Sequence, residues 1–164
     1  MTHFFPKHIC VLGAVLCAVA LGTAVSAERF GHLVPCALCL LERWPYRVGI
    51  FLGLAGAVLP ARSGRVGVAV MALVFLAAAA AASVHVGVEL GWWKSPLPEC
   101  TVPDLSGLPL AERFAHMPLR PAVSCEDPTY VLGRLSMAQA NLIYALAALA
   151  GITILRLRSR STPT

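Results

Sequence analysis

Long uncharged runs dominate the pattern of hydrophobic and polar positions along the 164 residues of the chain. Three of these runs, at 9–27, 66–88 and 135–155, contain between 19 and 23 residues each. Because about 20 apolar residues are enough to cross the hydrocarbon layer as a helix, each run predicts a transmembrane helix. Ser136 followed by Gln139 predicts a capping box at the start of the last one.

A fourth apolar segment, 40–59, is interrupted by charges only near its beginning, at Glu42, Arg43 and Arg47. Long basic side chains near a helix end can extend to the membrane interface, so this segment can also span the bilayer. We therefore predict an all-α membrane protein, a single domain over 1–164 built as a four-transmembrane-helix bundle.

The composition supports a membrane protein. Hydrophobic residues make up 58% of the chain and charged residues only 13%, whereas soluble domains are usually about a quarter charged. Such a chain also lacks the low hydrophobicity of disordered proteins. The net charge of +5 could suggest nucleic acid as a partner, but the basic residues form no cluster beyond short tails, so we expect no nucleic-acid binding.

The distribution of lysine and arginine predicts how the helices are oriented. Residues 1–8, 60–65 and 156–164 hold six basic residues and no acid in 23 positions. The opposite ends of the helices, with loops at about 28–39 and 89–134, hold the other seven basic residues and all eight acids. By the positive-inside rule both termini are cytoplasmic and the two loops are extracytoplasmic.

Two segments leave alternatives open. Residues 1–27 resemble a signal peptide, with a cleavage site after Ala27, but their apolar stretch is longer than a signal core, so we expect them to stay as the first helix. In the second outer loop, Leu110, Phe114 and Met117 recur at helical spacing. This spacing is as compatible with a short interfacial helix as with an irregular loop.

The six cysteines fall into two groups. Cys10 and Cys17 lie seven residues apart on one face of the first predicted helix, where buried cysteine normally acts as a small hydrophobic residue. The other four lie on the predicted outer side of the membrane, where disulfides form and persist. These four are Cys36, Cys39, Cys100 and Cys125.

Cys36 and Cys39 form a C-x-x-C motif, which alone is compatible with zinc binding, haem attachment or redox chemistry. Haem attachment would need His at position 40, where the chain has Leu40. A zinc ribbon would need a second close pair, whereas the other two outer cysteines are 25 residues apart, so we expect no metal site. A purely structural disulfide is the other interpretation, although so short a loop constrains the unfolded chain little.

The position of the motif favours redox chemistry at the membrane surface. It precedes a predicted helix, whose N-terminal dipole stabilises thiolate, and Arg43 follows Cys39 at i+4 on the same face. A guanidinium can stabilise a thiolate and can also donate hydrogen bonds to an oxygen of a lipid-soluble acceptor. An arginine that anchors the helix, or that pairs with Glu42, is an equally weighted alternative.

The segment Pro35–Arg43 resembles the P-C-x-L-C-x-x-E-R signature of the DsbB family, the disulfide bond formation proteins B. The resemblance continues in four further stretches and covers nearly the whole chain. They are His85–Glu89 with Trp92 and Trp93, Ser95–Pro96 before Cys100, Ser124–Glu126, and Leu132–Ala138. The Trp44–Pro45 step departs from the family pattern, although proline is tolerated in a first helical turn.

This resemblance implies a thiol oxidase of the bacterial inner membrane that reoxidises a DsbA-like periplasmic protein of the thioredoxin fold. Electrons would enter Cys100–Cys125, pass to Cys36–Cys39 and end on a membrane quinone, ubiquinone in preference to menaquinone. Cys100 would receive the attack of the partner, Cys125 would exchange with Cys36, and Cys39 would face the quinone. The residues expected at the quinone site are Arg43, His85 and Glu42.

Three prolines flank Cys100, at positions 96, 98 and 103. Because proline disfavours regular structure, we expect this cysteine on an extended, accessible segment.

Two other classes of function stay open. One is a four-helix quinone-coupled thiol enzyme related to vitamin K epoxide reductase, although such enzymes carry their C-x-x-C late in the helical domain rather than before the second helix. The other is a non-enzymatic membrane scaffold with two structural disulfides.

Overall fold

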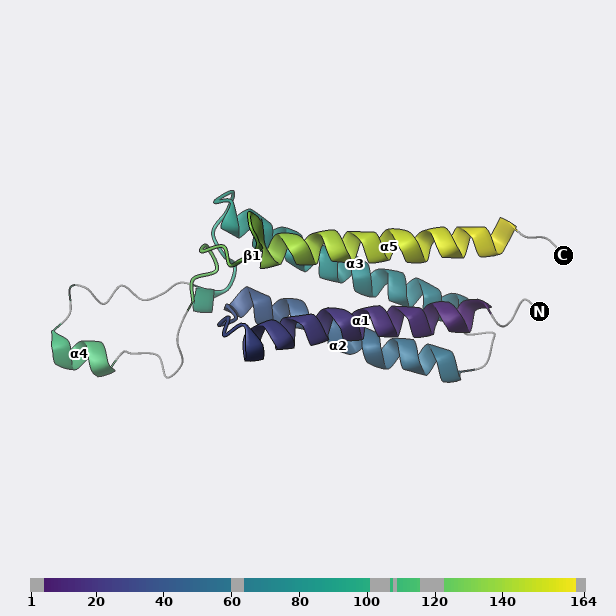
Figure 1. Ribbon diagram of the computed structural model, residues 1–164, viewed down its shortest axis with the longest axis horizontal. Helices are drawn as coiled ribbons and strands as arrows, with labels where there is room; N and C mark the ends of the chain where they lie inside the picture. The colour runs from purple at the N-terminus through teal and green to yellow at the C-terminus, as the bar shows by residue number, and fades with distance from the viewer. Residues whose placement is uncertain (1–4, 60–63, 101–106, 108, 116–122, 162–164) are drawn as a thin grey trace.

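The computed structural model describes residues 5–59, 64–100, 107, 109–115 and 123–161. Four long helices lie side by side as a bundle (Figure 1): α1 (Phe5–Phe30), α2 (Ala37–Val58), α3 (Gly64–Glu89) and α5 (Met137–Ser161). Helix α1 packs on α2, α2 on α3, and α3 on α5, while α1 also contacts α3 and α5. The four helices therefore share one core.

The 3₁₀ helix η2 (Pro98–Cys100) and the antiparallel hairpin of β1 (Tyr130–Leu132) and β2 (Leu135–Ser136) lie at the end of the bundle where α3 ends and α5 begins. The short helix α4 (Leu110–Ala115) lies apart from the bundle (Figure 1). Gly133 has a φ of +62° in the hairpin turn, a backbone conformation that glycine adopts without strain. The hairpin is a small addition, within the second predicted loop and the start of the last predicted helix, to a mostly helical chain.

Three of the helices are long and apolar enough to cross a membrane, over Lys7–Phe30, Val66–Glu89 and Met137–Arg158. These helices confirm the expected character of a helical membrane protein. Helix α2 is not among the candidates in the described chain, because its first half carries Glu42, Arg43 and Arg47. The fourth span stays a prediction.

The helix ends differ from the predicted ends by a few residues. The first helix continues beyond residue 27 to Phe30, and the last begins at Met137 rather than 135 because Leu135 and Ser136 pair with β1. The predicted capping box is confirmed at this start. Ser136 Oγ accepts the Gln139 N–H at 3.2 Å, and Gln139 Oε1 accepts the Ser136 N–H at 3.3 Å.

Cys10 and Cys17 lie fully buried in the main core, as expected for packing residues. The surface of α2 that faces α1 is made of small residues, the buried glycines Gly49, Gly53 and Gly56. A Cβ atom on Gly53 would lie 2.8 Å from the carbonyl oxygen of Cys10. Glycine is therefore required here for the close approach of the two helices.

Two further sequence expectations have outcomes in the fold. Pro45 is the ninth residue of α2 and does not lie in the first turn. It therefore cannot donate a backbone hydrogen bond to the Leu41 carbonyl. The segment expected as either an interfacial helix or a loop contains the short helix α4, with Leu110 exposed. The Phe114 side chain and Met117 lie outside the described residues.

Candidate active site

Cys36 and Cys39 lie at the beginning of α2, where Cys36 is the N-cap residue. The Cys36 Sγ accepts the backbone N–H of Cys39 at 3.2 Å, and the two sulfurs lie 2.8 Å apart as free thiols. The hydrogen bond from the Cys39 thiol, with a further one from His85, lowers the pKa of the Cys36 thiol to about 4 despite its burial. Cys36 is therefore a thiolate at neutral pH when the pair is reduced.

The other two outer cysteines form a disulfide, Cys100–Cys125. Both are buried, and together with Cys36, Leu38 and Val88 they form a compact cluster above the main core. The structure thus brings the two cysteine pairs, far apart in the sequence, into contact.

Cys100 is not on an extended, accessible segment, so that expectation is wrong. It is 2% exposed and ends the 3₁₀ helix η2, where its backbone N–H bonds to the Leu97 carbonyl at 3.2 Å. Proline fits the first position of such a turn, because it lacks a donor that would go unused there. Burial of the apolar disulfide against Leu38 and Val88 then favours the compact arrangement.

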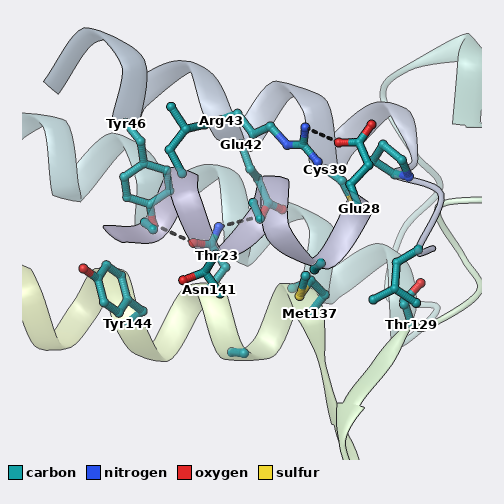
Figure 2. A pocket seen from close by; sticks show the side chains of 18 of the residues that line it. Thr23, Glu28, Cys39, Glu42, Arg43, Tyr46, Thr129, Met137, Asn141 and Tyr144 are labelled. Atoms are coloured by element: carbon teal, nitrogen blue, oxygen red, sulfur yellow. Dashed lines mark hydrogen bonds and ion pairs between the residues drawn. The ribbon is translucent and has the colours of Figure 1, made fainter. Parts of the chain in front are cut away.

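A pocket of about 240 Å³ lies between α1, α2 and α5, at the end of the bundle that carries the cysteines. Figure 2 shows it from close by. Its α1 and α5 walls are mainly apolar, with Ala20, Leu21, Ala24 and Met137 among the lining residues. The polar residues that line it from α2 are Cys39, Glu42, Arg43 and Tyr46.

Arg43 lies on the pocket wall beside Cys39, as the i+4 spacing predicted. Its side chain is only 11% exposed, and its Nη1 donates to Glu28 Oε2 at 2.7 Å (Figure 2). The guanidinium thus pairs with the end of α1 and not with Glu42, the partner weighed at the sequence level. Because it has five N–H donors, the remaining donors can serve a ligand in the pocket.

Glu42 and His85 are both buried and form an ion pair, Glu42 Oε1 to His85 Nδ1, at 2.7 Å. The other ring nitrogen, Nε2, lies 3.5 Å from Cys36 Sγ. His85 therefore lies beside Cys36, and it is not among the residues that line the pocket. Its predicted role in the quinone site stays a prediction.

Sequence reasoning missed three polar residues around this site. Asn141 of α5 donates from Nδ2 to Glu42 Oε2 at 2.6 Å, and its Oδ1 accepts the Tyr46 hydroxyl at 2.6 Å (Figure 2). Glu28, the partner of Arg43, is the third. The amide of Asn141 within an otherwise apolar span was the available signal, because polar residues inside membrane helices usually have a function.

Cys36, Cys39 and His85 bring three donor atoms within 4.8 Å of one another. The two sulfurs, however, are 2.8 Å apart, whereas two thiolates on one tetrahedral zinc ion would be about 3.8 Å apart. The geometry is that of a dithiol, and the expectation of no metal site stays a prediction.

Comparison with known proteins identifies the family. The family model described as "Disulfide bond formation protein DsbB" matches residues 6–155. A protein of Rickettsia prowazekii (strain Madrid E), itself described as uncharacterized, is 25% identical over 135 residues, which cover 80% of this chain and 76% of that protein. No solved structure matches the chain. Because the model spans most of the chain, the protein belongs to the DsbB family of membrane disulfide bond formation proteins, which are disulfide-generating oxidoreductases.

Proposed function

We propose that the protein reoxidises the dithiol of a DsbA-like periplasmic partner and passes the two electrons to a membrane quinone. The observation that supports this proposal is that the two cysteines of the C-x-x-C motif have different surroundings. Cys36 belongs to the buried cluster that contains the Cys100–Cys125 disulfide and does not line the pocket, whereas Cys39 lines the pocket. Electrons can therefore enter on one side of the motif and leave on the other without a diffusing carrier.

The entry side of the path consists of thiol–disulfide exchanges. A thiolate of the partner attacks Cys100, which breaks the Cys100–Cys125 bond and releases Cys125 as a thiolate. Cys125 then attacks Cys36 of an oxidised Cys36–Cys39 pair. The second thiolate of the partner resolves the partner–Cys100 bond, and the released Cys100 thiolate attacks Cys125 of the Cys125–Cys36 bond, which frees Cys36 and restores the Cys100–Cys125 disulfide. Each exchange forms one S–S bond and breaks one, so the two electrons of the partner dithiol end on Cys36 and Cys39. The contact between the two pairs in one cluster supports this order.

The pocket has the properties that a quinone head group needs. Its apolar walls suit the ring, and Arg43, Asn141 and Tyr46 place donor groups along its lining. A bound quinone would supply the acceptor for two electrons and two protons. Arg43 would bind and orient it by donating to an oxygen, with Cys39 as the adjacent thiol. We propose ubiquinone in preference to menaquinone as the acceptor. Comparison of kcat/KM for the two quinones tests this choice.

We further propose that α2 is the fourth transmembrane helix and that the cysteine pairs face the periplasm. Its charges are mostly satisfied within the bundle, because Glu42 pairs with His85 and Arg43 pairs with Glu28. Paired charges that face the interior of a bundle are tolerated at membrane depth. In this arrangement α1 begins and α5 ends on the cytoplasmic side, where the basic residues are concentrated (Figure 1).

The decisive experiment is quinone reduction by purified protein that is given a reduced thioredoxin-like substrate. The proposal expects one quinol formed for each disulfide made in the substrate. A matched Cys39→Ala variant should lose quinol formation. A scaffold with structural disulfides would reduce no quinone, and that result would contradict the proposal.

A further inference from the structure

A continuous chain of hydrogen bonds joins Cys36 to the pocket through side chains that the proposed electron path does not use. Cys36 Sγ lies 3.5 Å from His85 Nε2, and His85 Nδ1 lies 2.7 Å from Glu42 Oε1. The second carboxylate oxygen, Oε2, accepts from Asn141 Nδ2 at 2.6 Å. Glu42 and Asn141 line the pocket, whereas Cys36 and His85 lie behind it.

The reaction creates a need for such a chain. Oxidation of a dithiol to a disulfide releases two protons, and reduction of a quinone to a quinol takes up two. Cys39 lies at the pocket, but Cys36 is 6% exposed and is packed against the Cys100–Cys125 disulfide. The proton of Cys36 therefore starts in a buried place, away from the site where a proton is consumed.

We propose that His85 and Glu42 form a proton relay from Cys36 to the pocket, with Asn141 as the positioning residue for the carboxylate. This inference rests on the proposed function, because a quinone bound in the pocket would be the acceptor of the relayed proton. It concerns residues of α2, α3 and α5 that meet only in the folded bundle.

The relay balances in atoms and charge. In the reduced pair Cys36 is already a thiolate, and the proton that it has given up lies on His85 as the imidazolium of the His85–Glu42 ion pair. The relay step is then the transfer of the Nδ1 proton of His85 to Glu42 Oε1. Counted from the Cys36 thiol, the ring gains one proton and loses one, so its charge at the end is unchanged. Cys36 is left as a thiolate, and Glu42 is left as a neutral carboxylic acid on the pocket wall. The electrons remain on sulfur throughout this transfer.

The surroundings of His85 favour the transfer. From α2 it faces the thiols of Cys36 and Cys39 and the carboxylate of Glu42, and from its own helix it faces Glu89, one turn further on. Glu89 is held by the Ser136 hydroxyl at 2.5 Å and takes no part in the chain to the pocket. A carboxylate bonded to one ring nitrogen fixes the tautomer and raises the basicity of the other. The low pKa of Cys36, to which the His85 contact contributes, agrees with this role.

The test uses His85→Gln and Glu42→Gln in the full-length protein, with Glu89→Gln as the matched control. The first readout needs no quinone: the pH dependence of Cys36 alkylation in reduced, quinone-free protein. His85→Gln should shift the Cys36 titration to higher pH, while Glu89→Gln leaves it in place. The second readout is the steady-state rate with a soluble short-chain quinone. Both relay variants should lower kcat by about 10- to 100-fold with little change in KM for quinone, and the control should stay within about twofold.

The outcomes separate the relay from the function on which it rests. Wild-type protein that forms no quinol would contradict the proposed function. If the wild-type protein forms quinol and the relay variants keep its kcat and pH profile, the relay is wrong and the proposed function stands. A raised KM for quinone with an unchanged kcat in the relay variants would also overturn the relay, since these residues would then only shape the pocket. If Glu42→Gln does not fold, Asn141→Ala replaces it and should lower kcat while leaving the Cys36 titration unchanged.

Discussion

At the scale of single residues, Arg43 has two roles that the sequence alone left as alternatives. Its guanidinium is paired with Glu28, which ties the second turn of α2 to the end of α1, and it also lies on the pocket wall beside Cys39. The second role is the one that the proposed function uses. An experiment can separate the two, because pairing affects stability whereas ligand binding affects KM.

We expect Arg43→Ala to raise the apparent KM for quinone by about one to two decades, with exchange between the protein and its partner retained. A charge-assisted hydrogen bond contributes roughly 1.5–3 kcal/mol, which corresponds to this range. Steady-state rates of the purified variant at a series of quinone concentrations measure this KM. Arg47→Ala is the matched control, because Arg47 is an exposed cation of the same helix that lies over the Trp44 ring. Equal quinone kinetics in the two variants would remove Arg43 from the site.

The residues that were predictable share one property: they belong to a local motif. Cys36, Cys39 and Arg43 lie within eight positions, so helical spacing alone relates them. Asn141 is 99 positions from Glu42, and nothing in one sequence says which polar group will face which across a bundle. The burial of Cys100 was missed for a similar reason, because local proline effects were outweighed by packing of the disulfide on distant apolar residues.

At the scale of elements, α2 combines two kinds of packing. Its first half places charged and polar side chains in the interior, and its second half places the glycines Gly49, Gly53 and Gly56 against α1. The hydropathy pattern predicted this helix with its limits nearly correct, at 40–59 against Ala37–Val58. The glycine surface could not be inferred, because glycine in an apolar run is equally compatible with a lipid-facing position.

We expect Gly53→Leu to lower the thermal unfolding temperature of the protein in detergent. Its Cβ would lie 2.8 Å from both the Cys10 carbonyl oxygen and the Ala14 Cβ, so α1 and α2 would have to separate. The loss should be on the order of 1–3 kcal/mol, the usual range for overpacking. Gly151→Leu is the control, since nothing lies within 4 Å of a Cβ at that exposed position of α5. Equal stability of both variants would mean that the two helices do not pack as described.

At the scale of the whole molecule, the two ends of the bundle differ. One end carries the hairpin, η2 and both cysteine pairs, while α1 begins and α5 ends at the other (Figure 1). The distribution of basic residues, and not the fold, predicts which end faces the cytoplasm. Sequence reasoning could predict the four long helices because they depend on composition along the chain rather than on contacts, and the orientation stays a prediction.

We expect a membrane-impermeant thiol reagent to label Cys100 and Cys125 in intact cells after mild reduction. Reduction is required because the two form a buried disulfide. Peptide mapping identifies the labelled positions. Cys10 and Cys17, buried in the bundle, serve as internal controls and should stay unlabelled. Labelling that appears only after the inner membrane is broken would reverse the orientation.

We expect a partner that lacks its resolving cysteine to be trapped as a mixed disulfide on Cys100. This cysteine ends a three-residue 3₁₀ helix, an element with poorer hydrogen-bond geometry than an α-helix. Cys125 lies five positions before the hairpin and belongs to the same buried cluster as Cys36, so we expect it to attack Cys36 once it is released. Mass spectrometry of the trapped complex identifies the cysteine that is bonded to the partner. A crosslink mainly to Cys125, or directly to Cys36, would reverse the proposed direction of flow.

Under the proposed function, the burial of Cys100 and Cys125 affects which thiols reduce their disulfide fastest. A small free thiol reaches a sulfur only by collision, and the two residues are 2% and 1% exposed, so its attack would be slow. A protein partner that binds beside η2 would hold its own thiolate in line with the bond. The proposal therefore expects a large rate advantage for a thiol substrate that docks first over a small thiol at the same concentration.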